Sequence, residues 1–303
     1  MNFFTSPEDI ILMTPDWHGE RFADGRPRVS DDLLRRVKNL TTEEAWLPMW
    51  GKFKYQFESG FKRANEDPNY VMVGRAVTVQ MVPSRPDVNK ALLDEGHRQG
   101  HEGFFNQWTI QCLTEGDVLV VDEFDKVEWG TYVGGNLSTS IKNKTKTGGA
   151  VIWGGIRDLQ QIHKIKDYQV YYRDVDPTPI GLQDVMLGSV NMPTRIGKAV
   201  CIPGDVVLAT CSGVLFIPPQ MVEPACIAGE KAKCKDVFGF TRLKEGKYTS
   251  AQVDANIWAE CIMDDFQEWF KNSPDAKPYQ HLEWSEEIEK SKGVKLEDFN
   301  GVS

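Results

Sequence analysis

The stretch Ala-Val-Ile-Trp-Gly-Gly-Ile-Arg-Asp, residues 150–158, decides both the fold and the site predicted for this chain. Its four leading apolar residues are typical of a short strand that is buried on both faces. Two glycines follow, which let the backbone approach a ligand closely. Arg157 then offers a cation that can bind a carboxylate through two hydrogen bonds, and Asp158 offers a carboxylate that can hold a hard cation. Because catalytic groups of α/β domains collect beyond the carboxyl ends of buried strands, this pair is a candidate site. An ordinary surface salt bridge explains the spacing equally well.

The residues before this stretch follow a strand, turn, helix, turn, strand order. Residues 117–122 form a second short apolar run, Gly134-Gly135 precedes a helix predicted over 137–146, and Gly148-Gly149 closes it. This rhythm predicts locally parallel strands and a layered α/β domain. Further strands are predicted at 71–79, 170–172, 206–209 and 214–217, and helices at 31–37, 41–50, 87–96 and from 249 to 270, the last ended by Pro274.

The turn before the helix at 137–146 is a candidate anion site. The residues Gly134-Gly135-Asn136-Leu137 lead into a helix N-terminus, where free N–H groups suit a negatively charged ligand. A plain tight turn explains the same residues equally well. The segment lacks the Gly-Lys-Ser/Thr ending of a nucleotide-binding phosphate loop, so nucleotide binding is not expected.

A pair of histidines gives a weaker candidate for a metal site. His97 and His101 lie four residues apart beside Glu102, and on a helix both rings would share one face. Gly100 interrupts that spacing, and the sequence offers no evident third ligand. A polar helix end is therefore the favoured interpretation.

The composition excludes several classes of protein. The chain has 303 residues and 41% apolar content, enough for one large domain or two small ones. Its net charge is −9, and its densest basic cluster, Lys142, Lys144 and Lys146, is expected to be a solvated helix end, so a nucleic-acid partner is not expected. No stretch approaches the ~18 apolar residues that cross a membrane, so no membrane partner is expected either. The N-terminus resembles no secretory signal, and the six cysteines form no Cys-x-x-Cys pair. These features predict a cytoplasmic protein with buried free thiols.

Three segments are predicted along the chain. Residues 1–69 are interpreted as an N-terminal extension, residues 70–230 as the α/β core, and residues 231–303 as a C-terminal helical extension that ends in a polar surface tail.

Five short motifs, in order, resemble the RraA-like family. This family comprises the regulator of ribonuclease activity A together with 4-hydroxy-4-methyl-2-oxoglutarate aldolases and oxaloacetate decarboxylases. The motifs are GRAVTV at 74–79, GDVLVVD at 116–122, GGNL at 134–137, GGIRD at 154–158, and PGDVV at 203–207 followed by Gly213-Val214 and Ile217-Pro218. The resemblance implies a layered RraA-like α/β sandwich, with extra helical extensions at both termini.

The resemblance also implies a site. In the family's aldolases the aspartate matching Asp158 helps to bind Mg²⁺, partly through water, and the arginine matching Arg157 contacts a 2-oxo acid. Backbone N–H groups matching Gly135, Asn136 and Leu137 bind its carboxylate. Mg²⁺ or Mn²⁺ there would withdraw charge from the carbonyl, and the metal and Arg157 would stabilise the pyruvate enolate that C–C cleavage leaves. The family site lies between subunits, so a homotrimer or homohexamer is expected.

Departures from the family pattern leave the substrate open. Trp153 stands where the family usually has an acidic residue, Asn136 where its aldolases usually have glutamate, and Thr210 where its closing hairpin has aspartate. The segment between Asp87 and Gly116 is longer than usual, and its part from His97 to Trp108 could line the pocket, although a surface elaboration is the favoured interpretation.

The sequence therefore favours a metal-dependent lyase that cleaves a C–C bond of a small 2-oxo acid, by retro-aldol cleavage or decarboxylation. One alternative is a non-catalytic, protein-binding regulator of a ribonuclease. Asp158 favours the enzyme, because the regulator's signature lacks an acid after the arginine. Another alternative is a hydratase or other lyase that acts on a related hydroxy or oxo acid through the same metal site. A methyltransferase is not supported, since no glycine-rich cofactor fingerprint is present.

Overall fold

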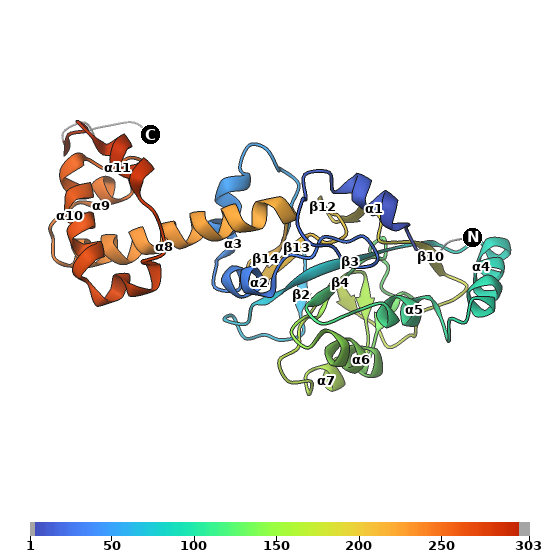
Figure 1. The fold of residues 1–303 in the computed structure, drawn as a ribbon. Coiled ribbons are helices and arrows are strands. Elements are labelled where there is room, and N and C mark those ends of the chain that lie inside the picture. The colour runs from blue at the N-terminus through green and yellow to red at the C-terminus, as the bar shows by residue number, and fades with distance from the viewer. Residues whose placement is uncertain (1–3, 297–303) are drawn as a thin grey trace. The chain divides into compact units, whose positions relative to one another are not determined.

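The computed structural model describes residues 4–296 of the chain. The chain folds as two compact units, Met1–Cys226 and Ile227–Ser303, and each has an apolar core of its own. The first unit is a layered α/β sandwich, which confirms the predicted fold class. Figure 1 shows α6 (Gly135–Thr145) and α7 (Leu159–Ile162) packed together against one side of its central sheet.

The predicted parallel strands form the centre of a nine-stranded sheet. β3 pairs in parallel with β4, β4 with β6, and β6 with β8, which confirms the βαβ prediction. β13 and β14 form the closing antiparallel hairpin next to β3, and β10 pairs with the second half of β3. The strands are β1 (Phe57–Glu58), β14 (Gly213–Ile217), β13 (Val206–Thr210), β3 (Met72–Pro83), β4 (Asp117–Asp122), β6 (Ala150–Trp153), β8 (Val170–Tyr172) and β2 (Lys62–Arg63) in sheet order, with β10 (Val185–Val190) beside β3.

Both faces of this sheet are covered. On one face, side chains such as Val77, Leu119 and Ile152 pack against four helices, α4 (Pro86–Arg98), α5 (Phe105–Gln111), α6 and α7. Over β13 and β14, the cover comes from α2 (Asp31–Val37), α3 (Thr42–Trp46) and the start of α8 (Val222–Lys244). On the other face, Val118 and Val151 pack against the hairpin of β11 (Thr194–Ile196) and β12 (Ala199–Cys201). Burial on both faces explains the uninterrupted apolar runs of the central strands.

A second, smaller sheet continues the central strands at their carboxyl ends. It is parallel and consists of β5 (Thr131–Val133), β7 (Gly155–Ile156) and β9 (Asp174–Val175), with β7 in the middle. β7 follows β6 after Gly154 alone, and β9 follows β8 after Arg173 alone. Arg157 therefore lies beyond the carboxyl end of β6, as expected, but the short buried strand β7 comes between them.

Residues between 26 and 63 are integrated into the first unit. β1 pairs with β14 and β2 with β8, at the two ends of the sheet. The Arg26 guanidinium is buried and lies 2.9 Å from a carboxylate oxygen of Asp117, which is itself buried in β4. The Arg75 guanidinium donates a 2.7 Å hydrogen bond to the carbonyl of Val29. Two buried cations therefore tie this segment to the central strands. Besides α2 and α3, the segment before residue 57 holds α1 (Pro7–Met13) and the 3-10 turn η1 (Leu47–Met49).

The second unit is helical and has an aromatic core. Phe238 of α8 contacts the rings of Trp258, Phe266 and Trp269 at centroid distances of 5.3, 5.4 and 5.5 Å. The capping box at Thr249 is confirmed, but the single helix predicted from 249 to 270 is wrong. The helices are α9 (Ser250–Val253) and α10 (Glu260–Asn272), followed by η3 (Pro274–Tyr279) and α11 (Ser285–Ser291); the 3-10 turn η2 (Pro219–Met221) precedes α8.

The break after α9 has a visible cause. The Trp258 indole N–H donates a 2.8 Å hydrogen bond to the carbonyl of Val253, which a continuous helix would have joined to the N–H of Ile257. Farther on, Leu282 and Trp284 are buried in the aromatic core, which differs from the polar surface tail expected after residue 275. The expected tail beyond residue 296 lies outside the described residues.

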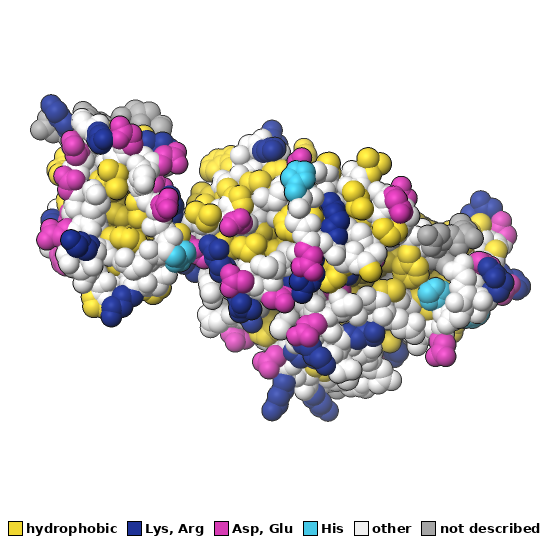
Figure 2. Space-filling model, in the orientation of Figure 1, with side chains coloured by type: hydrophobic (Ala, Val, Ile, Leu, Met, Phe, Trp, Pro, Cys, Tyr) yellow, Lys and Arg dark blue, Asp and Glu magenta, His cyan; other side chains and the backbone are white. Residues whose placement is uncertain are grey.

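The surface carries both signs of charge. On the side shown in Figure 2, Lys and Arg side chains alternate with Asp and Glu side chains. Within residues 4–296, no helix is both long enough and apolar enough to cross a membrane. All six cysteines are free, but Cys112, Cys211 and Cys261 are exposed, so the prediction of buried thiols holds for the other three.

Candidate functional site

Two neighbouring short strands bring Arg157 and the glycine loop together. β5 and β7 are parallel, and the N–H of Arg157 donates a 3.0 Å hydrogen bond to the carbonyl of Val133, the last residue of β5. After β5 the chain passes Gly134 and enters α6 at Gly135. The Arg157-Asp158 pair and the first turn of α6 therefore meet at the same edge of the small sheet.

Asp158 turns its carboxylate toward the start of α6. Its backbone is left-handed, with φ 57° and ψ 36°, a conformation that Asp tolerates better than most residues. One carboxylate oxygen accepts a 3.2 Å hydrogen bond from the N–H of Gly135 and lies 3.3 Å from an Arg157 guanidinium nitrogen. The Arg157 side chain is 41% exposed and that of Asp158 29% exposed, so both are accessible to a ligand.

The glycines of the loop make room for this arrangement. A Cβ atom at Gly134 would lie 2.3 Å from an Asp158 carboxylate oxygen, and one at Gly135 would lie 2.1 Å from the Gln161 amide oxygen. Neither position accommodates a side chain unless those groups move. Gln161 was missed by the sequence analysis, because a lone glutamine in a four-residue helix gives no signal of its own.

The other glycine pair has a different role from the one predicted. Gly154 and Gly155 were expected to let the backbone approach a ligand. Their missing Cβ atoms would instead meet Glu123 and Val127, at 2.7 and 2.9 Å. These glycines therefore allow the loop after β4 to pack closely, and the expectation is corrected.

A pocket of about 350 Å³ lies over these groups. It is lined by Gly134, Asn136, Leu137, Arg157, Asp158 and Gln161. Four of the five predicted site residues thus line one pocket. The fifth, Gly135, donates its N–H to the Asp158 carboxylate. Among the described residues, the first-turn N–H groups of Asn136 and Leu137 have no hydrogen-bond acceptor. Such groups at the N-terminus of an 11-residue helix favour an anion.

The oxygen atoms around the pocket are compatible with a hard divalent cation. Asp158 supplies a carboxylate, and Asn136 and Gln161 carry amide oxygens. Nowhere in residues 4–296 do three or more His, Cys, Asp or Glu side chains gather as a metal cluster. Mg²⁺ does not require one, because it commonly keeps several waters and binds one or two carboxylates together with its substrate. The space that Gly134 leaves beside the Asp158 carboxylate is consistent with such a site.

The histidine candidate is not a metal centre. The His97 ring forms a 2.9 Å hydrogen bond with the carbonyl of Gly103, and the His101 ring stacks on Trp108 with centroids 5.2 Å apart. Both rings thus belong to the packing around α4 and α5, in keeping with the polar helix end that the sequence favours.

One buried acid escaped the sequence analysis. Glu123 directly follows β4, is fully buried, and neither of its carboxylate oxygens has a hydrogen-bond partner among the described residues. Burial raises the pKa of this carboxyl well above its usual value. The sequence feature that could have identified Glu123 is its position at the carboxyl end of a central strand. It does not line the pocket beside Arg157.

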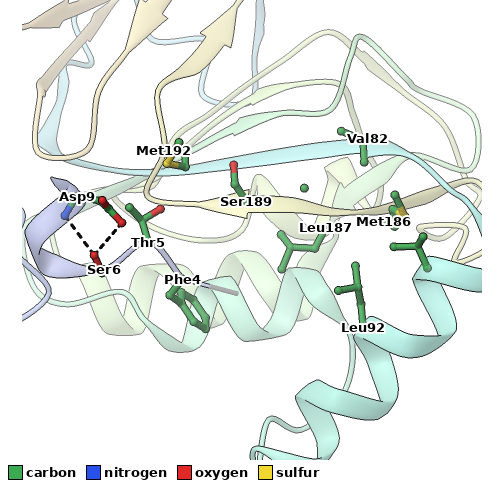
Figure 3. Close-up of a pocket in the computed structure, with 12 residues that line it drawn as sticks. Phe4, Thr5, Ser6, Asp9, Val82, Leu92, Met186, Leu187, Ser189 and Met192 are labelled. Atoms are coloured by element: carbon green, nitrogen blue, oxygen red, sulfur yellow. Dashed lines mark hydrogen bonds between the residues drawn. The ribbon is translucent and has the colours of Figure 1, made fainter. Parts of the chain in front are cut away.

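A larger hollow elsewhere lacks the groups for catalysis. It measures about 460 Å³ and lies between the segment before α1, strand β10 and helix α4 (Figure 3). Val82, Leu92, Met186 and Leu187 give it an apolar wall. Of the described residues that line it, Asp9 alone is charged, and its carboxylate accepts a 2.8 Å hydrogen bond from the Ser6 hydroxyl. Among the described residues, no Lys or Arg side chain and none of the predicted site residues line this hollow.

Comparisons with known proteins agree with the motifs. A model of the RraA-like family, described as aldolase/RraA, matches residues 27–216. An uncharacterized protein of Methanocaldococcus jannaschii is 26% identical over 138 residues, which cover 43% of this chain and 64% of the relative, so this chain spans somewhat less than two thirds of that relative's length.

Solved structures show the same fold. One, described as belonging to novel cellulases from gut-associated microbes, is 22% identical, with a TM-score of 0.58 over 78% of this chain and 96% of its own. Another is Streptomyces coelicolor RraAS2, described as an unusual member of the RNase ES inhibitor RraA protein family. It is 19% identical, with a TM-score of 0.55 over 72% of this chain and 98% of its own. At these identities the likeness shows the fold alone.

Proposed function

Since the chain belongs to the RraA-like family, which includes both lyases and ribonuclease inhibitors, we propose that it is a divalent-metal-dependent lyase that cleaves a C–C bond of a small 2-oxo acid. One observation carries this proposal: a single pocket brings together the Arg157 guanidinium, the Asp158 carboxylate and the unoccupied N–H groups at the start of α6. A protein-binding regulator would not need these three groups to converge in a pocket.

Each group has a role that its chemistry suits. The N–H groups of Asn136 and Leu137 bind the substrate carboxylate, because the helix N-terminus favours a negative charge. Arg157 donates hydrogen bonds to the 2-oxo oxygen and stabilises the charge that collects there as the C–C bond breaks. Asp158, with Gln161 beside it, would hold the cation. When bound, Mg²⁺ or Mn²⁺ supplies Lewis-acid polarisation of the carbonyl.

The same groups serve two related reactions. Retro-aldol cleavage and decarboxylation both leave a pair of electrons on the carbon next to the 2-oxo group, and both place negative charge on its oxygen. Arg157 stabilises that charge in either case. The expected homotrimer or homohexamer, whose neighbouring subunit would complete the site, stays a prediction.

The proposal is tested by pyruvate release from oxaloacetate and from 4-hydroxy-2-oxo acids, with and without Mg²⁺, after subtraction of the enzyme-free rate. We expect EDTA to abolish most turnover and Arg157→Ala to lower kcat by about 100-fold or more, the usual loss when a charge-stabilising donor is removed. Asp158→Asn should mainly weaken Mg²⁺ binding, which calorimetry measures.

A matched control is available in another exposed arginine. Arg35 is paired with Asp32 at 3.1 Å on α2, outside the pocket, so Arg35→Ala should leave turnover unchanged. Undiminished turnover in Arg157→Ala would place the activity elsewhere. If no acid is cleaved at all and the protein binds a ribonuclease, the regulator is the correct function.

A further inference from the structure

A second hollow adjoins the pocket of the candidate site at Arg157. It measures about 270 Å³ and shares Gly134, Asn136, Leu137 and Arg157 with the pocket already described. A ligand bound at Arg157 therefore has two directions in which to extend: toward Asp158, or into this second hollow, which we call the side chamber. Its remaining walls are Phe104, Asn106, Gln107, Thr131, Tyr132, Pro179 and Ile180.

Each polar side chain that belongs only to the side chamber forms at least one hydrogen bond within the protein. The Asn106 amide donates to the Tyr132 carbonyl at 2.8 Å, and its oxygen accepts from the N–H of Gln107 at 3.0 Å. Three further pairs complete the set: the Gln107 amide oxygen with the N–H of Phe104 at 2.7 Å, the Tyr132 hydroxyl with that of Thr109 at 2.7 Å, and the Thr131 hydroxyl with the Thr178 carbonyl. A ligand would break an existing hydrogen bond in order to use most of these groups.

The side chamber therefore offers a ligand mainly apolar surface, from Phe104, Leu137, Pro179 and Ile180. Among the described residues that line either hollow, Arg157 is the only cation and Asp158 the only carboxylate. One anionic group is thus matched, by Arg157 and the start of α6. This chain supplies no cation for a second carboxylate in the side chamber, and burying an unpaired charge is costly.

From this geometry we propose that the substrate is a 2-oxo acid with a single carboxylate, whose far end is an uncharged apolar group, branched aliphatic or phenyl, bound in the side chamber. This inference rests on the proposed lyase function. The volume is sufficient, since an apolar cavity of about 150 Å³ holds a benzene ring. Phe104, which immediately precedes α5, is then a specificity-determining residue.

The reaction balances for such a substrate. In a 4-hydroxy-2-oxo acid with a phenyl group on C4, the C3–C4 bond breaks and its electron pair stays on C3. The C4 hydroxyl gives up its proton and becomes the carbonyl of benzaldehyde. C3 takes up one proton, and the three-carbon product is pyruvate. The apolar aldehyde leaves from the side chamber, while the pyruvate carboxylate remains at α6.

The test compares kcat/KM for 4-hydroxy-2-oxo-4-phenylbutanoate with that for 4-hydroxy-2-oxoglutarate, which has the same reacting carbons and a second carboxylate. We expect the phenyl substrate to be favoured by about 10-fold or more, the discrimination that an apolar pocket provides. Phe104→Ala should lower kcat/KM for the phenyl substrate by about 10-fold and change that for the dicarboxylate little. Phe240→Ala, a change at an exposed phenylalanine of α8, is the matched control and should alter neither value.

The results that would overturn the side-chamber proposal differ from those that would overturn the lyase proposal. Turnover that favours the dicarboxylate, or that Phe104→Ala leaves unaffected, would overturn the side-chamber proposal and leave the lyase standing. If neither of these acids nor oxaloacetate is cleaved, the lyase proposal fails, and the binding of phenylpyruvate and of 2-oxoglutarate, measured by calorimetry, tests the side-chamber proposal separately. Binding of phenylpyruvate about 10-fold tighter, lost in Phe104→Ala, would support it, and equal or tighter binding of 2-oxoglutarate would refute it.

Discussion

Individual residues at the pocket have features that the stability gained from a surface ion pair does not explain. The contact between Arg157 and Asp158 is partly exposed, and such a pair stabilises a protein by about 0–1 kcal/mol. That gain does not account for the left-handed backbone of Asp158, which typically costs about 1–3 kcal/mol. It does not account for the close approach at Gly134 either. Both features place one carboxylate in front of α6, as the proposed ligand site requires, and the stability gained from the ion pair alone does not explain them.

A buried carboxyl elsewhere gives a prediction on pH. Asp205 lies in the turn before β13, is buried, and accepts a 2.8 Å hydrogen bond from the N–H of Ile202. Burial raises its pKa from 3.8 to about 7, so the folded protein retains a proton that the unfolded chain releases. The stability contributed by this group is therefore complete below about pH 4 and is lost as the pH rises through about 7. Asp205→Asn should remove this loss, which is on the order of a few kcal/mol because each pKa unit is worth about 1.4 kcal/mol.

Urea unfolding of both proteins between pH 4 and pH 8 checks this prediction. The difference in free energy of unfolding between variant and wild type should grow in favour of the variant as the pH rises toward about 7. Because other buried acids such as Glu123 remain in both proteins, their pH dependence cancels in the difference. A difference that stays constant with pH would show that Asp205 titrates normally.

At the scale of elements, the sequence analysis predicted those strands and helices that local residue patterns indicate. The central strands and the βαβ order were visible because a strand buried on both faces leaves a short apolar run between glycine turns. The meeting of Arg157 with the loop at Gly134 was anticipated through the family motifs. β7, with two residues, is too short to leave any periodic signal, and the sheet that places Arg157 exists only through pairing with β5 and β9.

Tertiary contacts decided the elements that the sequence analysis misjudged. The helix expected from 249 to 270 breaks because the Trp258 indole takes over the Val253 carbonyl, a contact that the apolar period does not reveal. The side chamber was anticipated only in part, because a pocket-lining role was the less favoured of two interpretations of the segment that holds Phe104. Its walls come from Phe104, from β5 and from Ile180, which lie far apart in the chain. Local pattern predicts elements, whereas the shape of a pocket depends on how they pack.

The segment before β3 is fastened to the sheet by a buried ion pair, which gives a prediction at this scale. Two guanidinium nitrogens of Arg26 bond the two oxygens of Asp117, at 2.9 and 3.2 Å, and both side chains are at most 2% exposed. Arg26→Ala would leave the Asp117 carboxylate buried without its cation. We expect the free energy of unfolding to fall by about 3–5 kcal/mol, measured by urea denaturation.

Arg28→Ala is the control, because Arg28 pairs with Glu20 on the partly exposed surface and should cost less than about 1 kcal/mol. Equal losses in the two variants would mean that the buried pair contributes no more than a surface pair. The segment before β3 would then be held mainly by its apolar contacts.

At the scale of the whole molecule, the candidate site belongs to one of the two units. Every residue of the candidate site and of the side chamber lies in the unit Met1–Cys226, and the family match ends at residue 216. The second unit has its own core of aromatic side chains and contributes none of these residues. The proposed chemistry therefore depends on residues of the first unit. The stability of each unit should depend on substitutions in its own core.

Thermal unfolding tests that independence. We expect two calorimetric transitions, because each unit has a core large enough to unfold cooperatively. Phe238→Ala removes a fully buried ring that touches three other aromatic rings, and should destabilise one transition by about 3–5 kcal/mol while leaving the other in place. Phe240→Ala, on the same helix but 59% exposed, should shift neither transition appreciably. α8 holds both Val222 of the first core and Phe238 of the second, so it joins the two units along the chain. A single transition that Phe238→Ala shifts as a whole would show that the two cores unfold together, against this expectation.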